Sequence, residues 1–345
     1  MRRVFVAGGA GFIGSNFIRQ LLAERPDVEV VNYDALTYAG NADNLRDVAG
    51  DPRYTFVHGS IVDRDGLAAA MRGCDAAVNF AAETHVDRSI HDASDFIETN
   101  VRGAYNLLAA ARDLGVERVL HISTDEVYGP ATADDPRFED DAFRPRSPYA
   151  VSKAAGDMMC RAFAETHGLQ VVVARPANNV GPYQHPEKAV PLFVTNALEG
   201  QPLPVYGEGL QMRDRLFVED AVRALLLLLE RGERGEAYNV QAGNHRTNVE
   251  VAKAVLDLLD KPYDLIRFVE DREGHDGCYW MDWSKLRALG WQPQWDFDAA
   301  MERTVRWYVD NRWWWEKLRS GEFRQYYQRQ YERRLEQARP YAASG

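Results

Sequence analysis

Short apolar runs that are typical of β-strands alternate with amphipathic segments over the first half of the chain. Six such runs cover residues 3–8, 28–34, 54–59, 75–83, 116–123 and 169–176, and segments with helical periodicity at 15–24, 63–73 and 100–115 lie between them. Continuous apolar strands separated by helices indicate a parallel sheet whose two faces are both covered. The alternation therefore predicts an α/β fold built on a doubly wound parallel sheet.

The second half of the chain contains a loop and shorter elements. Residues 176–191 are rich in Pro, Asn and Gly, and beyond them we expect helices at 192–200, 218–232 and 248–260 and strands at 203–207 and 237–241. We predict a first domain over residues 1–175 and a smaller C-terminal lobe over 176–345, some of whose elements return to the first domain. The aromatic and charged tail at 306–335 is expected to form two amphipathic helices packed on the body, and a dimer contact is the alternative.

Composition narrows the class of function. The net charge of −11 argues against binding to nucleic acid or to an anionic membrane, although a local basic pocket can still hold an anionic substrate. The three cysteines, Cys74, Cys160 and Cys278, are far apart, and the eight histidines show no metal-ligand spacing. We therefore expect reduced thiols, a cytoplasmic location and no metal site.

A glycine-rich turn, GGAGFIG, follows the first expected strand and opens a helix. Gly8, Gly11 and Gly14 permit a tight turn and let the backbone approach a pyrophosphate at the helix N-terminus. For this motif alone, an ordinary glycine turn is the alternative. Asp34, however, ends the second expected strand, where a carboxylate accepts a hydrogen bond from a ribose 2′-hydroxyl and repels a 2′-phosphate. Together these features predict a Rossmann-type dinucleotide site that prefers NAD to NADP.

Two further short motifs carry side chains suited to proton transfer. In YAVSK, Tyr149 and Lys153 share one face of an expected helix, where the ammonium favours the phenolate; a surface pair is the alternative. In STDEVYG, Asp125 and Glu126 directly follow a strand. If that strand ends near Ser123, both carboxylates can face one substrate instead of opposite sides, and a polar turn is the alternative.

These motifs give the chain a resemblance to the extended short-chain dehydrogenase/reductase superfamily and, more narrowly, to the dTDP-glucose 4,6-dehydratase family. The narrower resemblance rests on YDALTYAGN, FAAETHVDRSI, STDEVYG, SPYAVSKAAGD, NNVGPYQHPEKAVPLF, GEGLQMRD and DREGHD, and it extends over nearly the whole chain. It implies an NAD-dependent lyase whose substrate is a nucleoside-diphosphate hexose, dTDP-glucose above all. The implied reaction oxidises sugar C4, eliminates water across C5 and C6, and returns the hydride to C6, which yields a 4-keto-6-deoxy sugar.

The resemblance also implies a role for each residue of the two short motifs. Asp125 is the acid that protonates the departing C6 hydroxyl, and Glu126 is the base that removes the C5 proton. Thr124 hydrogen-bonds the C4 oxygen. Tyr149 removes the proton of the C4 hydroxyl, while Lys153 tunes Tyr149 and holds the nicotinamide ribose.

Other contact residues are carried over from the family by matching position. Those expected around NAD are Gly8, Gly11, Phe12, Ile13, Gly14, Asp34, Ala35, Leu36, Thr37, Ser60, Ile61, Phe80, Ala81, Ala82, Glu83, Thr84, Thr99, Tyr149, Lys153 and Asn179. Those expected around the nucleotide sugar are Thr84, Asn178, Lys188, Ala189, Pro204, Val205, Tyr206, Arg213, Asn248, Asp271, Arg272, Glu273, Gly274 and His275. Lys188 and Arg213 suit a diphosphate because they are cations.

The chain departs from the family pattern at several positions. Ser60 stands where the family has Asp, Thr84 where it has Ser, Val180 where it has Tyr, Glu273 where it has Pro, and Gly277-Cys278 where it has a basic pair after GHD. The last change borders the expected nucleotide site, whereas the five positions given chemical roles match the family. An NAD-dependent nucleotide-sugar epimerase or decarboxylase is one alternative function, and a non-enzymatic dinucleotide-binding regulator is another.

The resemblance further implies a homodimer. Relatives often pair through a four-helix bundle, to which each subunit gives two helices. The segments that match are 95–115 and 149–168. No nucleic-acid or membrane partner is expected.

Overall fold

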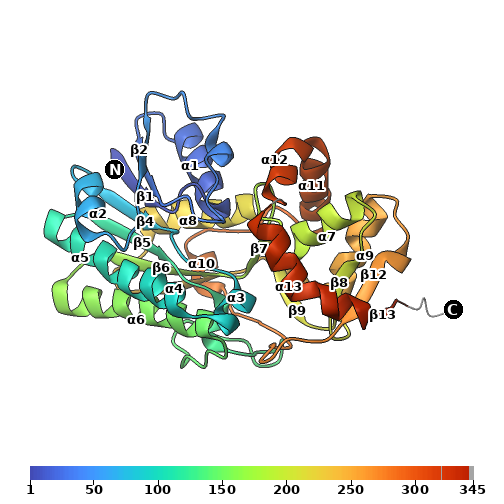
Figure 1. The fold of residues 1–345 in the computed structure, drawn as a ribbon. Coiled ribbons are helices and arrows are strands. Elements are labelled where there is room, and N and C mark those ends of the chain that lie inside the picture. The colour runs from blue at the N-terminus through green and yellow to red at the C-terminus, as the bar shows by residue number, and fades with distance from the viewer. Residues whose placement is uncertain (320, 342–345) are drawn as a thin grey trace.

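The computed structural model describes residues 1–319 and 321–341, which form two parts lying side by side (Figure 1). The larger part is built on a seven-stranded parallel sheet with the strand order β10-β6-β5-β4-β1-β2-β3. Its strands are β1 (Arg3–Ala7), β2 (Glu29–Asp34), β3 (Tyr54–His58), β4 (Ala76–Asn79), β5 (Arg118–Ile122), β6 (Val171–Pro176) and β10 (Ala237–Val240). All six apolar runs of the first half are strands of this sheet, so the predicted α/β fold is confirmed.

Helices cover both faces of this sheet. They are α1 (Phe12–Glu24), α2 (Arg64–Met71), α3 (Val86–His91), α4 (Ser94–Phe96), α5 (Ala104–Leu114), α6 (Pro148–His167), α8 (Val218–Arg231) and α10 (Ser284–Ala288), with the short helical segments η1 (Ala42–Leu45), η2 (Ile97–Gly103) and η3 (Asp125–Tyr128). Val4 and Val6 of β1 pack in one core with α1 and α8, whereas Phe5 and Ala7 pack in another with α2, α5 and α6. Alternate side chains of a strand point to opposite faces, so burial on both sides explains why the central strands are mostly apolar, whereas the residues of β3, at the edge of the sheet, are all at least partly exposed.

The smaller part contains two three-stranded sheets, in the orders β11-β9-β7 and β13-β12-β8. Its elements are β7 (Asn178–Val180), α7 (Ala189–Leu198), β8 (Leu203–Tyr206), β9 (Met212–Phe217), β11 (His245–Thr247), α9 (Asn248–Leu258), η4 (Tyr263–Leu265), β12 (Ile266–Val269), α11 (Phe297–Asp310), α12 (Arg312–Leu318), α13 (Glu322–Glu336) and β13 (Arg339–Pro340). A third core, formed mainly by α7, α9, α11 and α12, holds it together.

The chain passes between the two parts more than once. After β7, β8 and β9 it returns to the larger part, where α8 packs against α1 and β10 pairs with β6, with Ala237 aligned to Val173. It then enters the smaller part again at β11. The predicted division into a domain of residues 1–175 and a lobe of residues 176–345, with some elements that return to the first domain, stays a prediction.

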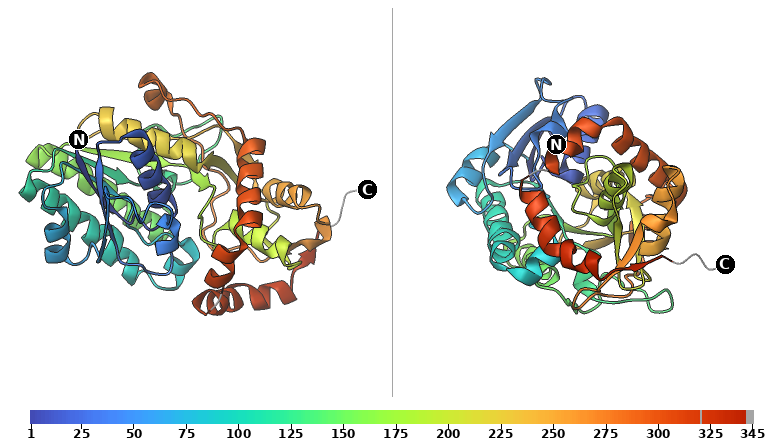
Figure 2. Two further views of the ribbon diagram at one scale, coloured as in Figure 1. Left: turned by 90° about the horizontal axis from the view of Figure 1, so that it is seen from above. Right: turned by 45° about the vertical axis from the view of Figure 1, so that its right-hand side comes forward.

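The aromatic tail packs on the body, as the sequence predicts. Trp314 and Trp315 of α12 are fully buried, and Trp314 Nε1 donates a hydrogen bond to Asn44 Oδ1 at 2.8 Å, which ties α12 to the larger part. Trp313, in contrast, is 46% exposed. The sequence predicted two helices over residues 306–335. The structure instead has three helices in this region: the end of α11, all of α12 and most of α13. These C-terminal helices lie across the junction of the two parts (Figure 2, red).

No helix in residues 1–319 and 321–341 is both long and apolar enough to cross a membrane. The same residues contain no group of three or more His, Cys, Asp or Glu side chains placed to hold a metal ion.

Candidate functional site

A cavity of about 430 Å³ lies between the two parts, at the carboxyl ends of the central strands of the seven-stranded sheet. Gly8 follows β1, Asp34 ends β2, Phe80 follows β4 and Ser123 follows β5, and all four residues line it. The opposite wall comes from β8, β9 and the residues that lead into α7. Open α/β sheets bind ligands in this crevice outside the carboxyl ends of their strands.

The glycine-rich turn between β1 and α1 requires glycine at two positions, Gly8 and Gly14. Gly8 has a φ of +74°, and a Cβ there would lie 2.5 Å from the amide nitrogen of Ala81. A Cβ on Gly14 would lie 2.4 Å from the carbonyl oxygen of Gly8. Gly11, the N-cap of α1, provides no side-chain cap for the helix. The N-terminus of α1 therefore faces the cavity with backbone only, which suits a pyrophosphate.

Asp34 joins β2 to this turn. Its carboxylate accepts hydrogen bonds from the N–H of Ala10 at 2.9 Å and the N–H of Leu36 at 2.8 Å, and burial raises its pKa. Because Asp34 lines the cavity next to the glycine turn, its remaining lone pairs can accept from ribose hydroxyls. The residues at this end thus fit the dinucleotide that the sequence predicts.

The cavity brings together nearly all residues expected around NAD. These are Gly8, Gly11, Phe12, Ile13, Gly14, Asp34, Ala35, Thr37, Ser60, Ile61, Phe80, Ala81, Ala82, Glu83, Thr84, Thr99, Tyr149, Lys153 and Asn179. Leu36 is the exception and does not line it. This residue has a φ of +50°, and its contribution is the backbone N–H that holds Asp34.

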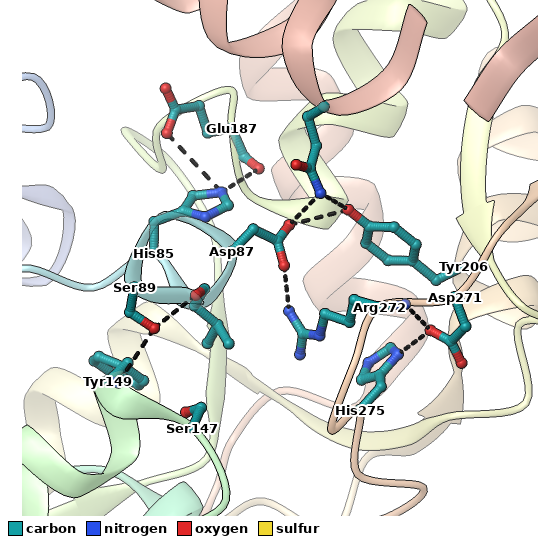
Figure 3. Close-up of polar contacts among 12 residues, drawn as sticks. His85, Asp87, Ser89, Ser147, Tyr149, Glu187, Tyr206, Asp271, Arg272 and His275 are labelled. Atoms are coloured by element: carbon teal, nitrogen blue, oxygen red, sulfur yellow. Dashed lines mark hydrogen bonds and ion pairs between the residues drawn. The ribbon is translucent and has the colours of Figure 1, made fainter. Parts of the chain in front are cut away.

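Most residues expected around the nucleotide sugar line the other end of the cavity. These are Thr84, Asn178, Lys188, Ala189, Pro204, Val205, Tyr206, Arg213, Asn248, Arg272 and His275. Asp271, Glu273 and Gly274 do not line it. Asp271 instead supports His275 from behind, with Asp271 Oδ1 lying 2.7 Å from His275 Nδ1 (Figure 3).

The adjacent acids Asp125 and Glu126 both line the cavity, because β5 ends at Ile122 and a 3-10 turn follows. The backbone leaves the alternating geometry of a strand at the point where the sequence predicted that it could. Burial, reinforced by the charge of Glu126, raises the pKa of Asp125 to about 7. Burial also raises the pKa of Glu126, but Arg272 and other nearby cations oppose that rise. The two carboxyl groups therefore stand in different electrostatic settings.

Tyr149 and Lys153 lie in the first turns of α6, beside the acids. The backbone N–H of Tyr149 donates to Ser89 Oγ at 3.2 Å (Figure 3), and the tyrosine hydroxyl hydrogen-bonds the side chain of Thr124. Lys153 Nζ donates to the carbonyl oxygen of Ile122 at 2.6 Å. Burial lowers the pKa of Lys153 to about 8, whereas burial and the nearby acids raise the pKa of Tyr149. The lowering of the Tyr149 pKa by Lys153 stays a prediction.

Asp87 is a central residue of the cavity that sequence reasoning missed. Its carboxylate accepts a hydrogen bond from Arg272 Nη1 at 3.1 Å and from the Tyr206 hydroxyl at 3.0 Å (Figure 3). Gln330 Nε2 of α13 lies 3.2 Å from the same carboxylate and 2.6 Å from the Tyr206 hydroxyl. Burial alone would raise the pKa of Asp87, but His85, Arg272 and the hydrogen bonds hold it below its usual value. The motif HVDRSI contained a signal for Asp87, because an acid there is specific to the family that the chain resembles.

The C-terminal helix α13 also contacts the larger part near this wall. Glu322 accepts from Arg88 Nη1 at 2.9 Å, and Arg88 Nη2 donates to the buried Glu187 at 2.6 Å. Tyr331 lines the cavity and packs its ring against that of Tyr206. The sequence could not predict that α13 reaches the cavity. Its amphipathic pattern shows that one face of the helix is buried, but it does not show which part of the protein that face contacts.

Comparison with known proteins places this geometry among nucleotide-sugar enzymes. The family model for GDP-mannose 4,6 dehydratase matches residues 5–304. The dTDP-glucose 4,6-dehydratase of Neisseria meningitidis serogroup B is 46% identical, over 94% of this chain and 98% of that protein. The dTDP-glucose 4,6-dehydratase 1 of Escherichia coli K12 is 44% identical, over 96% and 99%.

A solved structure agrees with these relatives. The crystal structure of DesIV, a dTDP-glucose 4,6-dehydratase from Streptomyces venezuelae with NAD and TYD bound, superposes with a TM-score of 0.89. It shares 51% sequence identity and covers 92% of this chain and 99% of that one.

Proposed function

The chain belongs to the GDP-mannose 4,6-dehydratase family, within the extended short-chain dehydrogenases/reductases, and we infer from this that it is an NAD-dependent dTDP-glucose 4,6-dehydratase. The observation that carries the proposal is the placing of Asp125 and Glu126 in one cavity with Tyr149. A lyase that removes water needs an acid and a base in addition to the group that starts the oxidation. These three side chains supply all of those functions.

NAD, when bound, supplies the acceptor and later the donor of the hydride. The chain's own residues at this step handle the proton: Tyr149 takes it from the sugar C4 hydroxyl, and Thr124, which hydrogen-bonds Tyr149, orients the C4 oxygen. Lys153 holds the nicotinamide ribose. Asp34 favours NAD over NADP because its carboxylate repels a 2′-phosphate. Denatured protein that releases mainly NADP would contradict this cofactor assignment.

The different electrostatic settings of the two acids support the roles that we propose for them in water loss. Burial raises the pKa of Asp125 to about 7, which favours its protonated form near neutral pH and suits it to protonate the departing C6 hydroxyl. Burial raises the pKa of Glu126, but the nearby cations Arg272, Arg213 and Lys188 oppose that rise because they favour the charged form of the carboxylate. Glu126 is therefore the base for the C5 proton, which the C4 ketone has made acidic.

Cations at the far end of the cavity fit a nucleoside diphosphate. Lys188 Nζ lies at the cavity and donates to the carbonyl oxygen of Thr84 at 2.7 Å. Arg272 and Arg213 stand on the same side. A local positive field of this kind holds an anion even in a chain with a net charge of −11.

A panel of nucleotide sugars, incubated with the pure protein and analysed by mass spectrometry, tests the proposal. We expect dTDP-glucose to lose the mass of one water and to give a 4-keto-6-deoxy product. A change of configuration without loss of mass would instead identify an epimerase, and loss of carbon dioxide from a uronic acid a decarboxylase. Absence of any turnover, with dinucleotide bound, would favour a regulator.

A homodimer through η2, α5 and α6 is part of the proposal. Apolar side chains on these segments are exposed: Ile97 at 56%, Tyr105 at 41%, Val151 at 52% and Met158 at 62%. Such a cluster suits burial against its own copy in a four-helix bundle. Light scattering should give twice the chain mass, and Met158→Glu should shift the protein toward monomer. The cytoplasmic location expected from the scattered cysteines also stays a proposal.

A further inference from the structure

Arg215 is a buried cation on the wall of the cavity that the proposed mechanism does not use. It lies on β9, is 5% exposed, and lines the cavity. Its Nη2 donates to Asn248 Oδ1 at 2.7 Å, while its buried Nε has no hydrogen-bond partner among the described residues. A buried guanidinium with an unsatisfied donor is costly unless a ligand satisfies it.

The neighbouring cation Arg213 is held differently. Its guanidinium donates to the carbonyl oxygens of Met212 and Asp276, at 2.8 and 2.7 Å, and stacks over the Tyr279 ring. Asp214, which lies between the two arginines in sequence, accepts from three backbone N–H groups of residues 242–244 and forms no ion pair with either arginine. Two guanidinium groups thus reach the cavity from one strand, and neither forms a salt bridge with a described carboxylate, although Asp125 and Asp214 interact electrostatically with Arg215.

We propose that Arg215 is a second guanidinium for the diphosphate of the nucleotide sugar, acting beside Arg213. The proposal rests on the proposed function, because it assumes a nucleoside-diphosphate substrate. A diphosphate offers several oxygens to the Arg215 guanidinium, which lines the cavity, and charge-assisted hydrogen bonds of this type are strong. The hydrogen bond from Arg215 Nη2 occupies Asn248 Oδ1, so the side-chain N–H groups of Asn248 remain to donate to the ligand.

The position of Arg215 also explains a departure from the family pattern. Gly277-Cys278 stands where the family has a basic pair. The structure pairs this segment with the start of β9, where the N–H of Met212 donates to the carbonyl oxygen of Gly277 at 2.8 Å. Arg215 lies further along β9, so it returns a cation to the wall from which the basic pair is missing.

Calorimetric titration of Arg215→Gln with dTDP, dTMP and thymidine tests the proposal. We expect dTDP to bind about 10- to 100-fold more weakly than to the wild type, dTMP to lose less, and thymidine to bind unchanged, because only the anionic part loses a partner. In turnover assays the KM for dTDP-glucose should rise while kcat changes little. Arg246→Gln is the matched control, since Arg246 lies on the paired strand β11 and does not line the cavity.

Arg215→Lys gives a second test that does not depend on folding of the Gln variant. A lysine keeps the charge but loses the planar fork, so dTDP affinity should fall by less than about 10-fold, with thymidine again unchanged. Unaltered dTDP binding in these variants, or an equal loss for dTDP and thymidine, would overturn the proposal. Because the titrations need no turnover, selective loss of diphosphate binding would stand even if dTDP-glucose were not the substrate.

Discussion

The hydroxyl of Thr124 donates a hydrogen bond to Asp125 Oδ1 at 3.0 Å, inside the cavity and one residue before Glu126. This contact fixes the carboxyl group of Asp125 and leaves its second oxygen to face a ligand. Because the backbone N–H of Glu126 also lies 3.3 Å from Thr124 Oγ1, one side chain sets the positions of both acids. The short turn after β5 therefore positions both acids as one unit.

Glu126→Gln should separate oxidation from elimination. The amide keeps the size of the side chain but removes the base, so Tyr149 can still start oxidation at C4 while loss of the C5 proton stalls. Substrate addition should produce a lasting nicotinamide absorbance near that of NADH, with little water lost. Asp125→Asn should also slow water loss but allow C5 to exchange with solvent deuterium. Near-normal dehydration by both variants would show that the pair is only a polar turn.

Tyr149→Phe should block the first step. Loss of the hydroxyl removes the group that takes the C4 proton, and removal of a general base typically slows a reaction about 10²- to 10⁴-fold. Binding of NAD and of dTDP should stay close to the wild-type values, because the ring of Tyr149 remains packed against Phe96. Single-turnover kinetics measure the step directly, and a rate within about two-fold of the wild type would assign the proton to another group.

Asp125→Asn should stabilise the protein in alkaline solution. Burial raises the pKa of Asp125 from 3.8 to about 7, so the folded state holds this proton more tightly than the unfolded chain. The stability due to that proton is complete below about pH 4 and is lost as the pH rises through 7. The variant cannot ionise, so its melting temperature should exceed that of the wild type at pH 8 and approach it at pH 4. The exposed Asp134→Asn serves as control, and equal shifts at both pH values would contradict the assignment.

Asp87→Asn should weaken substrate binding more than it slows chemistry. The amide can still accept one hydrogen bond but no longer pairs electrostatically with Arg272, which is then free to leave the wall. We expect the KM for dTDP-glucose to rise by about 10-fold or more, with a smaller change in kcat. Gln330→Ala, which removes a second partner of the same carboxylate, should act in the same direction but less strongly. An unchanged KM in both variants would show that Asp87 serves the fold alone.

The sequence predicted those features that local patterns control. Apolar runs identified six strands of the sheet, since burial on both faces favours apolar residues at most positions, although Asn32, Asn79, His121 and Arg175 are buried polar residues within them. The spacing from Gly8 to Asp34 predicted one end of the cavity, because β1 and β2 are neighbours and their carboxyl ends meet at the same edge. The end of β5 before the two acids could also be anticipated from a local pattern, because the apolar run stops at Ile122 and polar residues follow it.

Features that depend on packing between distant segments could not be predicted. Asp271, Glu273 and Gly274 do not line the cavity, because in a loop the sequence does not say which side chains point inward, and their contact with a ligand stays a prediction. Lys153 Nζ donates to a backbone carbonyl from β5, and its action on Tyr149 stays a prediction as well. The three residues that Asp87 joins come from β8, the loop after β12 and α13, and only the assembled fold shows that they meet.

The docking of α13 sets the order in which the site can be assembled during synthesis. This helix is translated after every element that it contacts, and it supplies Gln330 and Tyr331 to a wall whose other members lie as far back as Asp87. A chain still on the ribosome can complete its glycine turn and its acid pair well before that wall exists. A premature stop codon ahead of Glu322 should thus leave a protein that still binds the dinucleotide but binds sugar nucleotides weakly. Such a truncated protein could sequester the cofactor in the cell.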